Sequence, residues 1–483
     1  MRRLLLTALC TAGLTLPSAA DAFCGFYVSS AGADLFNDAT MVVLMRDGTR
    51  TVLSMQNNYR GPTDDFALVI PVPVVLKKDM VKTLPKNVFT RIDSLSSPRL
   101  VEYYEEGDCG PPPPMPPSSV QFSAGGGGMP RKLGVTIEAK FEVGEYEILI
   151  LSAKEALGLE TWLKENKYKI PESAAPLLAP YVQNNWKFFV AKVNAKKVTF
   201  VDGQAVLSPL RFHYDAEKFE LPVRLGLVNS SGTQDLIVHV IAKQRYELAN
   251  RPNVLVPTNV NLTPAAQGEF GPFYAALMEK TFAKNPEAAV TEFAWQGAMP
   301  PPQTMSQMGI YGVTCDPCPP PEPVDDPLTR YLGADVMPGV KTDEDVAKFA
   351  QAATLTRLHL RYGKDSVKDD LVLRITDPIA GGIPEKATPG AAKENRFQGR
   401  YIVRKPFDKN RCWAGMRGGG AFRGGPIGPP PGSLPTIPGA PASMSKPGKL
   451  TASFESYLKS DVPELGLKAT KPVETKKPEP KKK

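Results

Sequence analysis

The chain has 483 residues and a formal net charge of +8, with 58 Lys and Arg against 50 Asp and Glu. Much of this positive charge lies at the C-terminal end, where seven Lys and two Glu follow Leu467. The body of the chain is close to neutral, which gives no support for a nucleic-acid partner. The length allows about two to four domains.

The first 22 residues are typical of a secretory signal peptide. Arg2 and Arg3 precede an apolar run over 4–16, and Ala20-Asp21-Ala22 carries small residues at the positions that a signal peptidase reads, which predicts cleavage after Ala22. The run is shorter than the about 20 residues that span a bilayer, and no later segment is apolar for long enough. We expect an exported bacterial protein, periplasmic or secreted, with no transmembrane segment in the mature chain.

An N-terminal β region is predicted over 23–110. Two apolar runs within 41–56 meet at Asp47-Gly48, and this dipeptide is typical of a β-hairpin because its residues tolerate positive φ angles. Residues 66–73 follow as a buried strand that ends at Pro71 and Pro73. A Pro/Gly-rich loop over 111–131 has neither a helix nor a strand period.

A central β-rich region over 132–260 carries a helical insertion over 152–184. Strands are expected on both sides of Gly144 within 134–151, as a hairpin at Asp202-Gly203 within 198–207, and over 219–228 and 234–243. His239 alternates with apolar neighbours in the last strand and is interpreted as a strand residue rather than a ligand. Two helices are predicted, over 152–166 with a capping-box spacing of Ser152 and Glu155, and over 172–184.

A helix/β region over 261–410 follows, with helices over 273–284 and 342–353. Apolar residues at 346, 349, 350 and 353 form one stripe of the second helix, which predicts packing on a sheet.

The same region contains a Cys-x-x-Cys motif formed by Cys315 and Cys318. A redox site would place the first Cys at a helix N-terminus, but the PPPEP sequence after Cys318 cannot open a helix. A zinc site would need a second ligand pair, and the three histidines of the chain are scattered. A structural disulfide in a loop is favoured, with redox and metal roles as alternatives, and we assign no cofactor or metal. The disulfide candidates are Cys24, Cys109, Cys315 and Cys318, which leaves Cys412, and their pairing cannot be read from the sequence.

The stretch LHLRYGKDSVKDDLVLRI, over 358–375, is interpreted as two strands with a charged turn between them. In the first strand Leu358 and Leu360 share one face, while Arg357, His359 and Arg361 share the other. The turn over 363–370 leads to alternating apolar residues in the second strand. The sequence predicts a hairpin with a polar outer face, and the three basic residues are a candidate binding face for an anion or an acidic partner.

A Gly/Pro-rich linker over 411–449 and a basic, disordered tail over 450–483 end the chain. The predicted fold class is α+β, mainly β, with sandwich-like antiparallel sheets, a few peripheral helices and long Pro/Gly-rich loops.

Five separate stretches resemble one family in the same order. They are FCGFYVSSAGADLFNDAT, NNYRGPTDDFALVIPVP, SPLRFHYDAEKFELPVRLGLVNSSGTQDLIVHV, YGVTCDPCPPPEP and LTRLHLRYGKDSVKDDLVLRI. The family is the exported bacterial proteins described as domain of unknown function 2330, and the resemblance covers about Cys24 to Pro406. It implies an exported, β-rich protein, and it implies no reaction and no catalytic residues.

Chemistry-bearing motifs are few. No GxSxG nucleophile motif occurs, and Ser230, with His213 or His239 and Asp235, is better explained as part of a turn between strands. We therefore expect a non-enzymatic binding or envelope-associated structural module that engages protein or cell-envelope polysaccharide. The alternative is an extracytoplasmic hydrolase with a site assembled from distant residues, and a redox role of the Cys-x-x-Cys motif comes third.

Overall fold

The computed structural model describes most of the chain between Phe26 and Ala469. The described ranges are 26–29, 36–37, 41–56, 58–60, 66–104, 140–152, 162–165, 174–194, 197–201, 204–229, 233–297, 326–363, 368–382, 389–406 and 449–469. All six cysteines, the predicted signal peptide, Ser230, and the Pro/Gly-rich segments over 111–131 and 411–448 lie outside these ranges.

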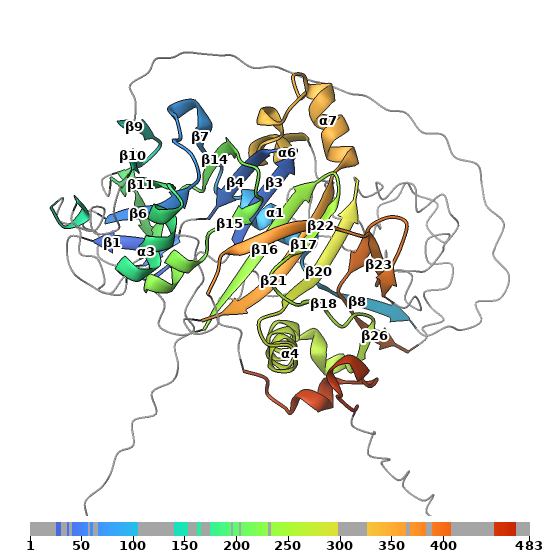
Figure 1. The fold of residues 1–483 in the computed structure, drawn as a ribbon. Helices are drawn as coiled ribbons and strands as arrows, with labels where there is room; N and C mark the ends of the chain where they lie inside the picture. The colour runs from blue at the N-terminus through green and yellow to red at the C-terminus, as the bar shows by residue number, and fades with distance from the viewer. Residues whose placement is uncertain are drawn as a thin grey trace, which may run out of the picture.

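An 11-stranded mixed sheet forms the centre of the molecule (Figure 1). Most neighbours in it are antiparallel, but three pairs are parallel: β16 with β3, β18 with β20, and β23 with β25. Along the sheet the strands are β24 (Gly390–Ala391), β23 (Ile379–Gly381), β25 (Arg396–Gln398), β20 (Ala289–Gln296), β21 (Thr354–Tyr362), β16 (Gln234–Ala242), β3 (Met41–Asp47), β4 (Arg50–Met55), β14 (Leu210–Asp215) and β7 (Val81–Thr83), with β18 (Asn253–Leu255) beside β20.

A second, antiparallel sheet packs on one face of the central sheet. Its five strands are β1 (Phe26–Ser29), β6 (Phe66–Val72), β11 (Lys187–Val193), β10 (Tyr146–Ser152) and β9 (Lys140–Val143). The two sheets share one hydrophobic core, in which Phe189 of β11 stacks on Phe212 of β14 with 5.4 Å between ring centroids. This is the packing of a β-sandwich.

Helices cover the two outer faces. The helix α3 (Ala174–Gln183) packs on the second sheet. On the open face of the central sheet lie α1 (Val88–Ser96), α6 (Asp326–Leu332) and α7 (Asp343–Ala352), and α4 (Phe270–Lys284) forms a separate core with neighbouring strands. Among the described residues, none of the helices is both long and apolar enough to cross a membrane.

Three smaller sheets and several 3-10 helices complete the fold. The sheets are β12 (Thr199–Val201), β13 (Gln204–Val206), β5 (Asn58–Arg60) and β2 (Phe36–Asn37); β15 (Glu220–Leu221), β22 (Leu371–Thr376) and β17 (Arg245–Leu248); and β19 (Val260–Leu262), β26 (Arg400–Lys405) and β8 (Arg99–Tyr104). The 3-10 helices are η1 (Lys78–Met80), η3 (Arg224–Asn229), η4 (Pro264–Gln267), η5 (Ala334–Val336), η8 (Phe454–Tyr457) and η9 (Pro463–Leu465).

The predicted fold class and three of the predicted hairpins are confirmed. Strands β3 and β4 pair around a two-residue turn at Gly48-Thr49, where Gly48 has a φ of +57°. Strands β9 and β10 pair around Gly144, and β12 pairs with β13 as predicted for 198–207. The helix α7 begins after Thr342 and buries the predicted stripe.

Two predicted β elements are wrong. Strands β21 and β22 do not pair, because β16 and β20 occupy both edges of β21, and β22 instead pairs with β15 and β17. The strand predicted over 219–228 is limited to Glu220 and Leu221. Pro222 then interrupts the ladder, since it has no N–H, and η3 follows.

The C-terminal residues differ from the predicted tail. Residues 450–469 contain η8 and η9, and Phe454 stacks on Phe273 of α4 with 4.9 Å between ring centroids. Tyr457, Leu458 and Val462 are buried in the same core. The apolar side chains of this segment, spaced among Lys and Glu, are enough to dock it on α4.

Candidate functional site

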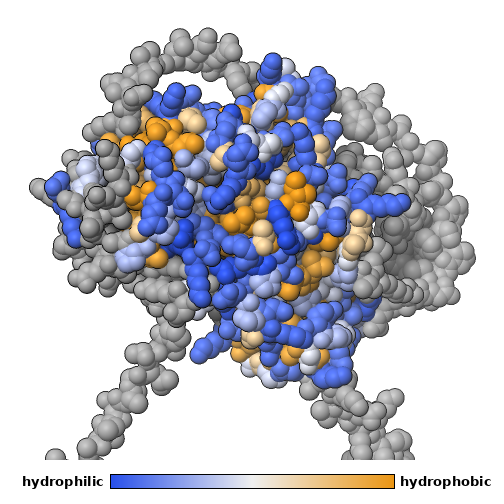
Figure 2. Space-filling view, viewed as in Figure 1, coloured by the Kyte–Doolittle hydropathy of each residue, from blue (hydrophilic) through white to orange (hydrophobic). Residues whose placement is uncertain are grey.

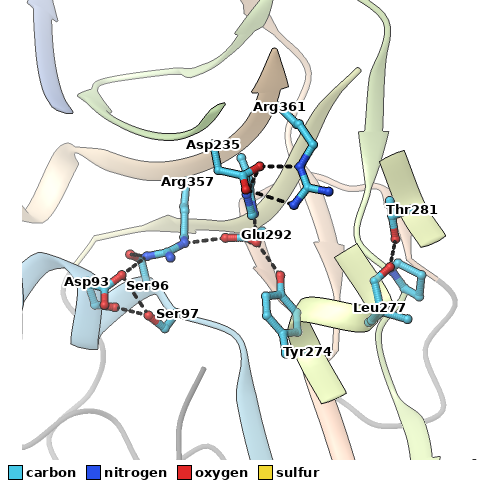
Figure 3. A network of polar contacts seen from close by, with 12 residues as sticks. Asp93, Ser96, Ser97, Asp235, Tyr274, Leu277, Thr281, Glu292, Arg357 and Arg361 are labelled. Atoms are coloured by element: carbon cyan, nitrogen blue, oxygen red, sulfur yellow. Dashed lines mark hydrogen bonds and ion pairs between the residues drawn. The ribbon is translucent and has the colours of Figure 1, made fainter. Parts of the chain in front are cut away.

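Arg357 and Arg361 of β21 lie in a polar network with Asp93, Asp235 and Glu292 (Figure 3). His359 belongs to the same network through its bond to Glu292. The exposed fraction is 3% for Arg357 and 1% for His359, and Arg361 is half-buried. Their acidic partners come from this chain, on β20, β16, α1 and α4. The predicted polar outer face is therefore covered for Arg357 and His359, and anion binding at this face stays a prediction.

Glu292 of β20 is the centre of this network. The pairing of β20 with β21 shifts between Thr291 and Phe293, so Glu292 has no residue opposite it. Such a β-bulge redirects a side chain. The Glu292 carboxylate accepts hydrogen bonds from the Tyr274 hydroxyl of α4, from His359 Nδ1 at 2.9 Å and from Arg357 Nε.

Arg357 joins this centre to helix α1. Its Nη1 donates to Asp93 Oδ1 and lies 3.4 Å from Ser96 Oγ. The Ser97 hydroxyl donates to the same Asp93 oxygen at 3.1 Å. His239 of β16, which is also fully buried, has its Nε2 3.0 Å from Ser96 Oγ. The network thus ties the C-terminal turn of α1 to β16, β20 and β21.

The outer end of the network reaches the solvent-facing side of α4. Arg361 forms a two-bond pair with Asp235 of β16, at 2.7 and 2.9 Å, and Arg361 Nη1 donates to Glu279 of α4 at 2.5 Å. The guanidinium also lies 5.0 Å from the ring centroid of Phe282. The bond between Arg361 and Glu279 joins α4 to β21.

The electrostatics of the buried part favour a protonated His359. Burial alone would lower the pKa of His359, but the carboxylates of Glu292 and Asp235 outweigh burial and raise it. Its Nε2 lies 3.5 Å from Asp235 Oδ1. For Glu292, burial acts in the opposite direction and would raise the pKa of the carboxyl group. The charges of Arg357 and His359 outweigh burial and hold this pKa at about 2. Among the described residues, Asp93 and Glu292 share the guanidinium of Arg357, and a protonated His359 would supply a second positive charge beside Glu292.

This network is built to hold elements together. Within the described part of the chain, its ionisable groups are bonded to one another. Glu292 was not singled out by the sequence, although a carboxylate within the apolar run AVTEFAW is the kind of residue that needs a buried partner. Its partners are far away in the chain and are invisible to local patterns.

A second candidate site is a polar pocket of about 260 Å³ beside α3. We call it the Asp370 pocket. It lies where the end of α3, the strand β15, the start of η3 and the residue before β22 meet. Its lining residues are Tyr181, Asn184, Trp186, Lys218, Glu220, Arg224 and Asp370.

Buried Asp370 holds the wall of this pocket in place. Its carboxylate accepts hydrogen bonds from the Tyr181 hydroxyl at 2.7 Å, from the backbone N–H of Val223 at 2.9 Å and from Arg224 Nη2 at 2.9 Å. The Arg224 guanidinium lies over the Tyr181 ring, 4.8 Å from its centroid. Asp370 thus caps the start of η3 from a distant segment, which is a further reason why the predicted strand ends there.

Lys218 and Glu220 are the two charged groups of the pocket that remain available to a ligand. Within the described part of the chain, Lys218 and Glu220 form no ion pair and no side-chain hydrogen bond. Burial raises the pKa of the half-buried Glu220 carboxyl, and Asp370 acts in the same direction, while Lys218 opposes them. A cation and a carboxyl therefore face one cavity without an internal partner.

The residues of the hydrolase alternative do not come together where they are described. Asp235 contacts Arg361 and His359, whereas His213 lies on β14 beside Arg50 and Arg211, whose charges, after burial, lower its pKa. Ser230 and the cysteine candidates Cys24, Cys109, Cys315 and Cys318 lie outside the described residues. Among the described residues, no group of His, Cys, Asp and Glu has the arrangement of a metal site.

The surface offers no large apolar alternative on the face in view. Figure 2 shows hydrophobic residues in small separate groups between hydrophilic ones. Val75, Tyr331 and Ile375 are the large hydrophobic residues that are exposed in the described part of the chain. Such scattered residues are ordinary on a protein surface.

Residues 18–374 match the model of a family described as an uncharacterized protein conserved in bacteria, DUF2330. The chain belongs to this family. The DUF2330 match contains every residue of the buried network and of the Asp370 pocket. It ends within β22, so β23 to β26 and the C-terminal segment on α4 lie beyond it.

Comparisons of this DUF2330 protein with curated proteins and with solved structures give no further information on its function. No curated protein matches it. Among solved structures, a crystal structure of baculovirus P35 is similar at 12% sequence identity, over 44% of this chain and 69% of that one. Its TM-score is 0.24, which is too low to support an argument about fold or function.

Proposed function

We propose that this DUF2330 protein is an exported, non-enzymatic binding module of the bacterial envelope, and that the Asp370 pocket holds its ligand. The proposal rests on one observation: some residues that line the pocket are bonded to one another, and two charged residues beside them have no bonding partner among the described residues. Asp370, Tyr181 and Arg224 bond one another, while Lys218 and Glu220 face the same cavity with no internal partner. Concave sites with a few converging polar groups are the usual ligand sites of proteins.

The arrangement supports binding better than hydrolysis. A glycoside-type hydrolase would use two carboxyl groups, and Glu220 and Asp370 do line one pocket. Asp370, however, already accepts bonds from three neighbouring groups, so it has little capacity left to act as a base or nucleophile. Glu220 would then have to work without a partner.

The proposal is tested by thermal unfolding of the mature protein with a panel of sugars, amino acids, nucleosides and carboxylates. A ligand that binds the folded state raises Tm, by an amount equivalent to about 2.7 kcal/mol at a concentration of 100 Kd. The variant Lys218→Met/Glu220→Gln should lose the shift, and Lys393→Met, an exposed lysine between β24 and β25, should keep it. A shift that survives in the pocket variant would contradict the proposal.

Export is tested by expressing the full chain in a bacterial host and separating the fractions. We expect a protein shortened by the first 22 residues in the periplasm or medium, and cytoplasmic retention when residues 2–22 are deleted. Full-length protein in the cytoplasm would exclude export. In the exported protein, the four candidate cysteines are expected to be protected from alkylation until a reductant is added.

A further inference from the structure

We propose that the Asp370 pocket takes a single neutral sugar unit, free or at the end of an envelope polysaccharide. This inference rests on the proposed function above and names the chemistry of its ligand. Three properties of the pocket lead to it: its balance of charge, its size, and its mixture of donors, acceptors and an aromatic ring.

The charges that line the pocket cancel. Lys218 and Arg224 are cationic, and Glu220 and Asp370 carry carboxyl groups. Arg224 and Asp370 neutralise each other at 2.9 Å. A ligand with a net charge would leave one charge of the pocket or of the ligand without a partner inside the cavity, which is less favourable than a matched set. A neutral, polar ligand avoids this penalty.

The volume favours one ring rather than a long chain. At about 260 Å³, the pocket is below the range of about 300–1,000 Å³ that holds drug-sized ligands. It also lies at the surface, since Asn184 and Lys218 are exposed. A terminal unit of a longer polymer can therefore enter while the rest of the polymer stays outside.

The lining matches hydroxyl groups, which both donate and accept hydrogen bonds. The Lys218 ammonium is a donor, and Glu220 is an acceptor. Asn184 uses its Nδ2 to donate to Pro180 O at 2.9 Å, and its amide oxygen has no partner in the described part of the chain. Several hydroxyls on one small ring would satisfy these groups at the same time.

An aromatic ring completes the site. Trp186 is half-buried at the pocket, and its ring lies 5.5 Å from that of Tyr181. Because Arg224 covers the Tyr181 ring, we assign the contact with the C–H face of a sugar ring to Trp186, the other aromatic residue of the lining. The other ligand classes match the lining less well. A lipid chain would make no use of the charged groups, and a phosphate ion would make no use of the indole ring.

The test titrates the mature protein separately with D-glucose, D-galactose, D-mannose and N-acetyl-D-glucosamine. The comparison probes are L-serine, which is a zwitterion, and the anions inorganic phosphate and D-glucuronate. Calorimetry measures Kd. The chain has four Trp, so the fluorescence change that the wild type shows and Trp186→Phe lacks is the signal of Trp186. At least one neutral sugar should bind, and Trp186→Ala should weaken that binding by about tenfold. Glu220→Gln should weaken it as well, whereas Trp186→Phe should retain most of the affinity.

The outcomes separate the two proposals. Binding of L-serine, phosphate or D-glucuronate without binding of any neutral sugar, and lost in Lys218→Met or Glu220→Gln, would overturn the sugar inference and leave the pocket as a binding site. Sugar binding that is unchanged in Trp186→Ala, Glu220→Gln and the Lys393→Met control would overturn the assignment to this pocket. Absence of binding by every probe, with all variants folded by circular dichroism, would overturn both.

Discussion

At the scale of single residues, the chain uses its charged side chains in two different ways. Arg357, Glu292 and Asp93 are buried and bonded to one another, so each compensates the desolvation of the others. Lys218 and Glu220 face a cavity and bond nothing within the described residues. The first group explains stability, and the second is where a ligand would find unused hydrogen-bonding capacity.

Replacing Arg357 tests the buried group. Arg357→Met leaves Asp93 and Glu292 without their guanidinium, and breaking a buried ion pair from one side costs about 3–5 kcal/mol. The free energy of unfolding should fall by that amount in a denaturant titration. The control is Lys348→Met, which removes the exposed pair with Glu344 and should change stability by less than about 1 kcal/mol. If both variants changed the free energy of unfolding equally, the buried network would contribute no more to stability than an exposed ion pair.

The pH dependence of stability isolates His359. Since its folded-state pKa is raised above 6.5, its contribution is fully present below pH 6.5 and is lost as the pH rises through the folded pKa. The contribution of Glu292 has the opposite sign, being present above pH 4.5 and lost as the pH falls through about 2. His359→Gln should therefore lose stability relative to the wild type mainly at acidic to neutral pH. Parallel stability curves of the two proteins from pH 5 to 9 would contradict this assignment.

At the scale of elements, some helices are determined by their own sequence and others by contacts with distant strands. Helix α7 is set by its own sequence: the Thr342 side chain accepts from the Asp345 N–H at 3.2 Å, and Asp345 accepts from the Thr342 N–H at 2.8 Å. Helix α4 instead depends on what surrounds it, with Tyr274 and Glu279 bonded to β20 and β21. Both helices were predicted from the sequence, over 342–353 and 273–284, but the bonds that tie α4 to β20 and β21 were not.

Removing the cap tests the autonomy of α7. Thr342→Ala deletes the oxygen that accepts the Asp345 N–H and should lower the free energy of unfolding by about 1 kcal/mol. Gln351→Ala, at an exposed position of the same helix, should change it by no more than about 0.5 kcal/mol. Chemical denaturation of both variants decides the point, and a Thr342→Ala protein as stable as the wild type would speak against the cap.

At the scale of the whole molecule, the regions predicted along the chain do not build separate sheets. The central sheet takes β3, β4 and β7 from residues 23–110, β14, β16 and β18 from 132–260, and β20, β21, β23, β24 and β25 from 261–410. In particular, β16 lies between β3 and β21. A region on its own would therefore leave strand edges with unpaired backbone N–H and C=O groups, which strands of another region pair in the whole chain.

A fragment experiment follows from this topology. Residues 132–260 alone should lack a cooperative unfolding transition and tend to aggregate, because β16 loses both neighbours and the shared core is opened. Residues 23–469 should unfold cooperatively. Thermal and urea unfolding of both chains provides the comparison, and a cooperative transition in the short fragment would mean that it is a domain of its own.

The sequence by itself determined what depends on near neighbours. Asp47-Gly48 specified a hairpin, the apolar stripe at 346, 349, 350 and 353 specified a helix, and strand alternation specified that Arg357, His359 and Arg361 share a face. The tertiary structure alone decided what lies against that face. Arg357 meets Glu292 and Asp93, which are 65 and 264 residues away in the chain. A period of two distinguishes the faces of a strand, but a polar face bonded to buried carboxylates and a polar face in water have the same period.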